Sequence, residues 1–130
     1  MDVAKALAVA LALNRTAFGL GYLLRPQQAR TSWIGRAARK PGTQVMIRSQ
    51  GVRDVALGAG ALRALARGDR EELRAWVACH GVCDFADLLA TWVAREHLPQ
   101  RRARAAMAIA GASTVIGAAA AAGLRPSEES

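Results

Sequence analysis

Polar and ionisable residues lie near the middle of three long apolar segments in this 130-residue sequence, at about the same depth in each. They are, in chain order, Asn14, Arg15, Arg53, Asp54, His80, Asp84 and Asp87. A fourth apolar segment has only Ser113 and Thr114 at the matching level. Charges at the centre of an apolar segment are costly, and in membrane spans they usually mark a functional site.

The chemistry that these residue types support is proton transfer. Carboxyl groups held beside guanidinium groups can differ in protonation state, so that one acts as a base while burial keeps the other protonated as an acid. Such a site could open an epoxide, move a double bond or close a ring. We therefore predict cofactor-independent acid–base chemistry on a lipophilic small molecule.

Helical spacing brings these residues together. His80, Asp84, Asp87 and Thr91 follow i, i+4, i+7 and i+11 spacing, which places them on one stripe of a helix. Polar residues of the second segment cluster within about a turn, next to glycines that permit close helix approach. They are Gln50, Arg53 and Asp54, beside Gly51 and Gly58. On the first segment, Arg15, Gly19 and Tyr22 share a face.

The predicted catalytic residues are Asp84, Asp87, Arg53, Arg15, His80 and Asp54. The two later carboxyl groups would react, and the guanidinium groups would orient them and stabilise developing negative charge. The histidine or the first aspartate would tune them. The predicted substrate-binding residues are Asn14, Gln50, Tyr22 and Thr91. No cofactor is predicted, since the sequence has no Gly-rich phosphate loop and no dinucleotide fingerprint.

Structural ion pairs that fix helix register are the main competing interpretation. With Arg48 counted, the segments hold three acids and three bases, whose formal charges cancel as burial requires. A buried pair is a poor source of stability, and one pair would fix register, so the larger set favours a site. A proton or ion pathway needs the same residue types, although four short helices leave little room for alternating access.

Two cysteines lie beside the third set. Cys79 and Cys83 are spaced i, i+4, which gives poor disulfide geometry on a helix, so we predict reduced packing residues. A metal site built from His80, Cys83 and the nearby aspartates would need a ligand from another helix. We predict no metal.

Four apolar segments predict the fold, with approximate bounds of 3–24, 43–66, 73–94 and 105–123. Each can cross a hydrocarbon core of about 30 Å at about 1.5 Å per residue. High Ala content and scattered β-branched residues favour helix over strand. We predict an all-α bundle of four transmembrane helices, forming one domain over residues 1–130. The connection after residue 24 is predicted to be polar, basic and turn-rich.

A soluble, Ala-rich four-helix bundle is the competing fold, because the second segment would be a poor lone membrane span. Two observations favour the membrane. The fourth segment has no charged residue from Ala105 to Leu124, unlike a soluble amphipathic helix. Trp76 and Trp92 lie about 24 Å apart along a helix, flanked by Arg74 and Arg95, as interfacial anchors should be.

The net charge of +8 is concentrated in the first and third connections, which carry nine Lys and Arg against one Glu. The opposite side has six of each sign. This asymmetry follows the positive-inside rule and places the first and third connections in the cytoplasm. A nucleic-acid binder would interleave aromatic residues with its basic face, and this sequence shows no such pattern, so no nucleic-acid partner is predicted.

Several short motifs support these predictions. The run Gly51-Val52-Arg53-Asp54-Val55-Ala56-Leu57-Gly58, followed by Asp84…Asp87-Leu88-Leu89-Ala90-Thr91, resembles a family of small four-helix bacterial membrane proteins. The opening Arg15…Gly19-Leu20-Gly21…Leu24-Arg25-Pro26 is also similar to it. That family is abundant in high-GC actinobacteria and mainly of unknown function, with a looser likeness to the DoxX-like group. The resemblance implies four transmembrane helices, and that the Arg-Asp pair and the later aspartates belong together.

We therefore expect a multi-pass protein of the bacterial inner membrane with a charged pocket formed by the first three segments. The favoured function is an acid–base enzyme of epoxide-opening, isomerase or cyclase type. The alternative is a non-catalytic membrane binding or accessory protein whose buried ion pairs are structural. The expected partners are the lipid bilayer and a lipophilic small molecule, and a homo-oligomer is compatible with this pattern.

Overall fold

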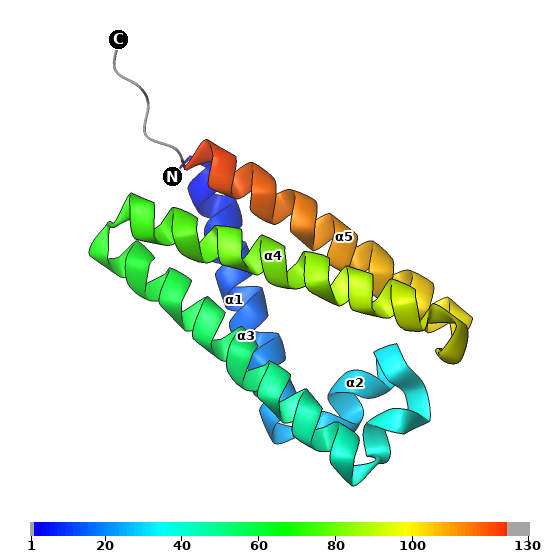
Figure 1. The fold of residues 1–130 in the computed structure, drawn as a ribbon. Coiled ribbons are helices and arrows are strands. Elements are labelled where there is room, and N and C mark those ends of the chain that lie inside the picture. Colours follow the sequence, from blue (N-terminus) through cyan, green and yellow to red (C-terminus); the bar gives the residue numbers. More distant parts are fainter. Residues whose placement is uncertain (1, 125–130) are drawn as a thin grey trace.

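The computed structural model describes residues 2–124 and contains helices and no strand within that range. Four long helices run alternately up and down, so that α1 begins and α5 ends at the same end of the bundle (Figure 1). Their bounds are α1 Val3–Leu24, α3 Pro41–Arg67, α4 Arg70–Ala94 and α5 Gln100–Gly123. The connections at the opposite end contain the short helix α2 Pro26–Ile34 and the 3₁₀ turns η1 Gly35–Arg39 and η2 Arg95–His97. The all-α prediction is confirmed.

Each predicted segment corresponds to one long helix, but three of the helices begin earlier than predicted. α1 has the predicted bounds, whereas α3, α4 and α5 start at Pro41, Arg70 and Gln100. The predicted starts followed the change from polar to apolar composition, while a helix starts at its cap. For α4 that cap is Asp69, whose carboxylate accepts a hydrogen bond from the Glu72 backbone N–H at 2.8 Å.

The prediction of a turn-rich first connection was wrong, because α2 and η1 occupy it. Pro26 lies in the first turn of α2, where a missing backbone N–H leaves no helical bond unmade. Gly35 ends α2 with φ +65°, a conformation that favours glycine. Trp33 of α2 contacts α4, and its indole N–H donates to the Thr91 hydroxyl at 3.1 Å.

α1 and α3 pack with their backbones in direct contact. A Cβ placed on Gly19 would lie 2.7 Å from the Gly51 carbonyl oxygen, and one on Gly51 would lie 2.8 Å from the Gly19 oxygen. Further along the same interface, a Cβ on Gly58 would lie 2.7 Å from the Ala12 oxygen. The predicted role of Gly51 and Gly58 in close helix approach is confirmed.

α3 and α4 diverge from the turn that joins them. Gly68 makes this turn with φ +70°, and α2 lies at the open end opposite it (Figure 1). α5 packs along α4, where a Cβ on Gly117 would lie 3.3 Å from the Gly81 Cα. This arrangement leaves space among the long helices toward the end that α2 occupies.

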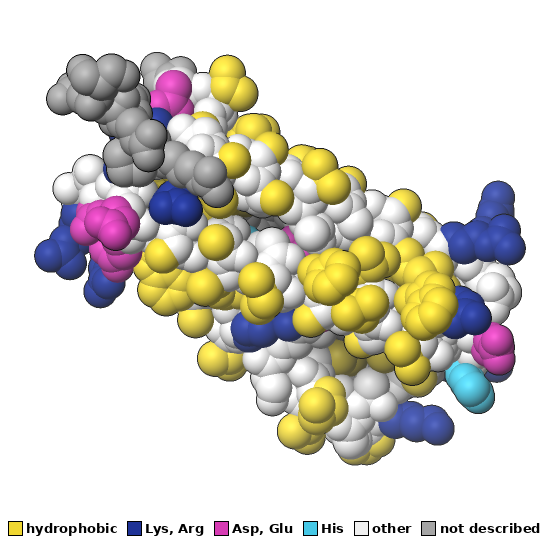
Figure 2. Space-filling model, turned by 45° about the horizontal axis from the view of Figure 1, so that its top comes forward, with side chains coloured by type: hydrophobic (Ala, Val, Ile, Leu, Met, Phe, Trp, Pro, Cys, Tyr) yellow, Lys and Arg dark blue, Asp and Glu magenta, His cyan; other side chains and the backbone are white. Residues whose placement is uncertain are grey.

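The described chain exposes much apolar surface. Large apolar side chains such as Val82 and Ile109 are 70% and 71% exposed, and Figure 2 shows apolar side chains along the length of one face, with charged ones mainly at its two ends. Three helices are long and apolar enough to cross a membrane, namely Val3–Leu24, Arg70–His97 and Gln100–Gly123. These features are typical of a membrane protein rather than a soluble monomer.

The predicted tryptophan anchors differ from each other. Trp92 is exposed, and the Arg95 guanidinium lies 4.5 Å from its ring centroid, which suits an interfacial position. Trp76 is half-buried against Gly60 of α3, and its indole N–H donates to Glu72 at 3.3 Å. Trp76 therefore contributes to helix packing as well as to the end of the bundle.

We expect the protein to fractionate with membranes and to need detergent for extraction, because its exposed apolar side chains lie along the whole bundle. The measurement is ultracentrifugation of a lysate, followed by extraction with salt, with alkaline buffer and with detergent. Recovery as a monodisperse monomer without detergent would contradict this prediction.

Candidate functional site

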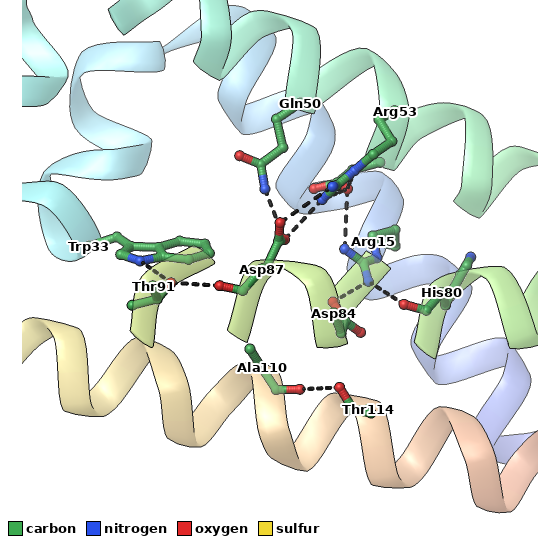
Figure 3. Close-up of polar contacts among 11 residues, drawn as sticks. Arg15, Trp33, Gln50, Arg53, His80, Asp84, Asp87, Thr91, Ala110 and Thr114 are labelled. Atoms are coloured by element: carbon green, nitrogen blue, oxygen red, sulfur yellow. Dashed lines mark hydrogen bonds and ion pairs between the residues drawn. The ribbon is translucent and has the colours of Figure 1, made fainter. Parts of the chain in front are cut away.

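Five charged side chains from three helices form one continuous network, Asp84–Arg15–Asp54–Arg53–Asp87, which we call the ion-pair network (Figure 3). Arg15 of α1 lies between two carboxylates. Its Nη1 donates to Asp54 Oδ1 of α3 at 3.1 Å, and its Nη2 donates to Asp84 Oδ1 of α4. The same Nη2 also donates to the His80 backbone carbonyl at 3.4 Å. The predicted contact of Arg15 with a later aspartate is confirmed.

Arg53 completes the network on the other side of Asp54. Its Nε and Nη2 each donate to Asp54 Oδ1 at 3.2 Å. Its Nη1 and Nη2 donate to Asp87 Oδ1 and Oδ2 at 3.3 and 2.9 Å, which is a bidentate pair. Gln50 Nε2 also donates to Asp87 Oδ2, at 3.0 Å. Both guanidinium groups are therefore committed to carboxylates.

The glycine contacts between α1 and α3 explain why Arg15 reaches Asp54. Gly19 lies one turn after Arg15 on α1, and Gly51 lies one turn before Asp54 on α3. Their direct backbone contact brings the two helices close enough for a guanidinium on one to bond a carboxylate on the other.

The network is well shielded. The side chains of Asp54, Asp84 and Arg15 are 3%, 9% and 11% exposed, whereas Asp87 and Arg53 are 19% and 33% exposed. The Arg53–Asp87 pair is therefore more exposed than the other three members of the network.

The prediction that the six segment charges cancel within one buried cluster was wrong. It counted Arg48, which is exposed on α3 and belongs to none of the ion pairs of the described residues. The network itself contains three carboxylates and two guanidinium groups, so it has a formal charge of −1 when every member is ionised.

Two carboxylate oxygens of the network accept no hydrogen bond from the described residues, Asp54 Oδ2 and Asp84 Oδ2, and the second of these is fully buried. Asp84 Oδ2 is buried and has no hydrogen-bond partner among the described residues, whereas Asp84 Oδ1 accepts from Arg15. In Figure 3 this second oxygen points away from Arg15, toward α5. Because a buried carboxylate oxygen without a partner is costly, it is the natural position for a proton or for a group on a ligand.

Asp84 lines a cavity of about 270 Å³. The polar lining of this cavity comes mainly from α1, α3 and α4, with Ser113 from α5, and its apolar lining comes mainly from α1, α2 and α5. The lining residues are Leu11, Asn14, Arg15, Phe18, Tyr22, Trp33, Gln50, Asp54, Asp84, Asp87, Ala105, Ala106, Ile109, Ala110 and Ser113. The predicted pocket comprised only the first three segments, but α2 and α5 also form its walls.

A more open groove of about 540 Å³ lies between α3 and α4 near α2. Three residues, Trp33, Gln50 and Asp87, line both the groove and the cavity. Arg53 and Thr91 line only the groove. Asp87 therefore lies between the two spaces.

The predicted substrate-binding residues fall into two groups. Asn14 and Tyr22 line the cavity, and Gln50 lines both spaces. Thr91 is buried at the groove, where it accepts from Trp33 and donates to the Asp87 backbone carbonyl at 2.7 Å. Thr91 thus supports the position of Asp87.

His80 is placed differently from its predicted role. Its side chain is fully buried, and in Figure 3 the ring points away from Asp84. Neither ring nitrogen makes a hydrogen bond within the described residues, although the Leu57 backbone lies close enough to interact electrostatically. His80 contributes its backbone carbonyl to Arg15 and no side-chain contact to the carboxylates.

The cysteines lie outside the network. Cys79 is exposed, Cys83 is half-buried, and both are free thiols. Over residues 2–124, no group of three or more His, Cys, Asp or Glu side chains is arranged to hold a metal ion.

Sequence reasoning missed the contributions of Phe18, Trp33, Ile109 and Ser113 to the cavity. Ser113 had a signal, since it lies at the depth of the charged residues. For Trp33, the sequence showed only a single large apolar residue within a basic connection. That pattern does not indicate where the ring packs.

Residues 12–124 match the model of a family described as a domain of unknown function, DUF4267. The match includes every residue of the ion-pair network and all but one residue, Leu11, of the cavity lining. No curated protein and no solved structure matches the chain. The likeness to the DoxX-like group stays a prediction. With its network inside the matched region, the chain belongs to the DUF4267 family of unknown function.

Proposed function

We propose that this protein is an integral membrane enzyme that performs acid–base chemistry on a lipophilic small molecule bound in the cavity. The observation that carries the proposal is that Asp84, whose buried Oδ2 has no hydrogen-bond partner among the described residues, lines a space of about 270 Å³ with largely apolar walls. Ligand sites typically combine apolar walls with a few converging polar groups. Here the polar groups include the carboxyl groups of Asp84 and Asp87, which differ in solvent exposure and in the arginine that each contacts.

The proposed membrane arrangement has four crossings, because α3 runs beside α1 along most of its length. The charges in the middle of α3 face the network, except for the exposed Arg48, whose long side chain can extend toward the nearer membrane surface. The connections rich in Lys and Arg lie at one end of the bundle, which supports their placement in the cytoplasm of a bacterial cell.

In the proposed mechanism, Asp84 is the acid and Asp87 is the base. A proton on Asp84 Oδ2 would be transferred to an oxygen or an alkene carbon of the substrate. Asp87, ionised beside Arg53 and Gln50, would accept a proton from water or from the substrate. Asp87 also lines the groove, so water can approach it without crossing the apolar part of the cavity. Asp84 therefore loses one proton and Asp87 gains one. Transfer of a proton from Asp87 back to Asp84 would then return the network to its starting state.

The guanidinium groups would hold this arrangement. Arg15 holds Asp84 through Oδ1 and makes no bond to Oδ2, while Arg53 holds Asp87 through a bidentate contact. This differs from the predicted role of stabilising negative charge on the substrate, since both groups already bond carboxylates.

A non-catalytic binding or accessory protein is the second candidate. The observation that favours it is that all three carboxylates already have guanidinium partners, as expected of a structural network. In that case Asp84 would matter for stability and not for turnover.

Replacing Asp84 by Asn separates these candidates. The network would then hold two carboxylates and two guanidinium groups, and Arg15 would keep Asp54, so we expect stability within about 1 kcal/mol of wild type. Turnover of lipophilic epoxides or alkenes should be abolished, since the amide cannot supply the proton. The measurements are melting temperature in detergent and product formation by mass spectrometry.

Asp54→Asn is the matched control, because Asp54 bonds both guanidinium groups. We expect it to cost about 3–5 kcal/mol of stability, because Asp54 Oδ1 accepts three guanidinium hydrogen bonds, and a hydrogen bond to a charged group contributes about 1.5–3 kcal/mol. If Asp84→Asn instead lost stability and its residual turnover followed the folded fraction, the structural candidate would stand. Wild-type protein that turned over no substrate of either class would likewise contradict the enzyme.

A further inference from the structure

We infer that the site acts on alkenes or epoxides, whose reacting carbon becomes positively charged, and not on carbonyl compounds that react through enolates. This inference rests on the proposed function and narrows its substrate class. Three observations support it: the network has a net negative charge, its guanidinium donors and the Gln50 amide already bond carboxylates, and aromatic side chains line the cavity.

The network has one negative charge more than it has positive charges. It contains three carboxylates and two guanidinium groups. Arg48, on the same helix as Arg53, is exposed and is not part of the network. Because a buried net charge is costly, the network is most stable when it gains one proton or when a positively charged group binds beside it. Asp84 Oδ2 is the fully buried carboxylate oxygen of the network that accepts no hydrogen bond from the described residues, so we assign the proton to it.

Protonation of a neutral substrate keeps this balance. Before transfer, the proton is on Asp84 Oδ2, and the network and the substrate are both neutral. After transfer, the O–H bond of Asp84 is broken and a new C–H or O–H bond is formed on the substrate. The substrate then carries +1, the network carries −1, and the two charges lie next to each other, which is favourable at low dielectric.

An enolate would find no guanidinium group of the network that is not already bound to carboxylates, and the donors of Asn14, Tyr22 and Ser113, which also line the cavity, are neutral. The nitrogens of Arg15 and Arg53 that make hydrogen bonds in the described structure donate to carboxylates or to the His80 carbonyl, and the Gln50 amide donates to Asp87. Developing negative charge on a substrate would therefore lie beside excess carboxylate charge.

The cavity walls suit a cation. Three of the six aromatic residues of the chain line it, namely Phe18, Tyr22 and Trp33. The Phe18 and Tyr22 rings lie side by side with centroids 6.2 Å apart and planes inclined at 44°. Aromatic faces stabilise a nearby cation through their quadrupole.

The test compares three probes of one shape that differ in charge: geranylamine, geraniol and geranic acid. Binding is measured in bilayer nanodiscs at neutral pH, and empty nanodiscs correct for partition into lipid. The cationic amine mimics the charge of the transition state, so it should bind wild-type protein about tenfold or more tightly than the alcohol. The acid should bind most weakly.

Asp84→Asn should reduce the preference for the amine over the alcohol to about twofold or less, while Arg48→Gln should leave it unchanged. Phe18→Leu should lower amine binding more than alcohol binding. Equal binding of amine and alcohol by wild type, or tightest binding of the acid, would overturn this inference and leave the proposed function standing. If no probe bound, the cavity would not be a lipophilic site, and both would fail.

Discussion

Arg15→Gln should destabilise the protein by about 3–5 kcal/mol, more than any other single change within the network except Asp54→Asn. Arg15 is the only link from α1 to the carboxylates of α3 and α4, and it is 11% exposed. Its removal would leave three carboxylates with one guanidinium group. The expected result is a large fall in melting temperature, measured in detergent by intrinsic fluorescence.

Arg48→Gln provides the matched control, because it removes the same charge from an exposed position outside the network. It should change stability by no more than about 0.5 kcal/mol. The double variant Arg15→Gln with Asp84→Asn restores the −1 charge and should be more stable than Arg15→Gln alone. Equal melting temperatures for Arg15→Gln and Arg48→Gln would show that the network contributes nothing to folding.

Gly19→Ala should have the next largest effect, about 1–3 kcal/mol, because it adds a methyl group where two backbones touch. The new Cβ would lie 2.7 Å from the Gly51 carbonyl oxygen and 2.8 Å from the Val55 backbone nitrogen. Backbone atoms cannot move aside as a flexible side chain can, so α1 must shift away from α3. That shift would also lengthen the contact between Arg15 and Asp54, so turnover should fall with stability.

Gly21→Ala tests whether this effect comes from packing. Gly21 lies two residues later on the same helix, and a Cβ placed on it has nothing within 4 Å. Its replacement should be neutral or stabilising by up to about 1 kcal/mol, since Ala is the better helix former. Similar loss for both variants would mean that contact between α1 and α3 is not the cause.

The sequence predicted the long helices and the charged residues well, because both depend on local patterns. Apolar length and the absence of breakers identified all four helices, and i, i+4, i+7 spacing placed Asp84 and Asp87 on one face. Helices α3 and α4 also share a spacing, since Gly51 and Gly81 each precede an aspartate by three residues. In the structure both glycines lie at helix contacts, and both aspartates, Asp54 and Asp84, accept from Arg15.

Other features depend on packing between distant residues and could not be predicted. Arg48 and Arg53 have similar local surroundings in sequence, yet one is exposed and the other is in the network. The way in which α3 packs decides which of the two arginines reaches the network. It therefore also decides the net charge of the network. The short helix α2 brings Trp33 to Thr91, a contact across 58 residues that composition does not indicate.

The protonation state of Asp84 in a bilayer tests the central claim most directly. Infrared spectroscopy of the protein in nanodiscs at neutral pH can resolve the C=O stretch of a protonated carboxyl group in a dry environment. We predict one such band in wild-type protein, its loss in Asp84→Asn and its retention in Arg48→Gln. No protonated-carboxyl band in wild type, or a band that persists in Asp84→Asn, would contradict the assignment of Asp84 as the acid.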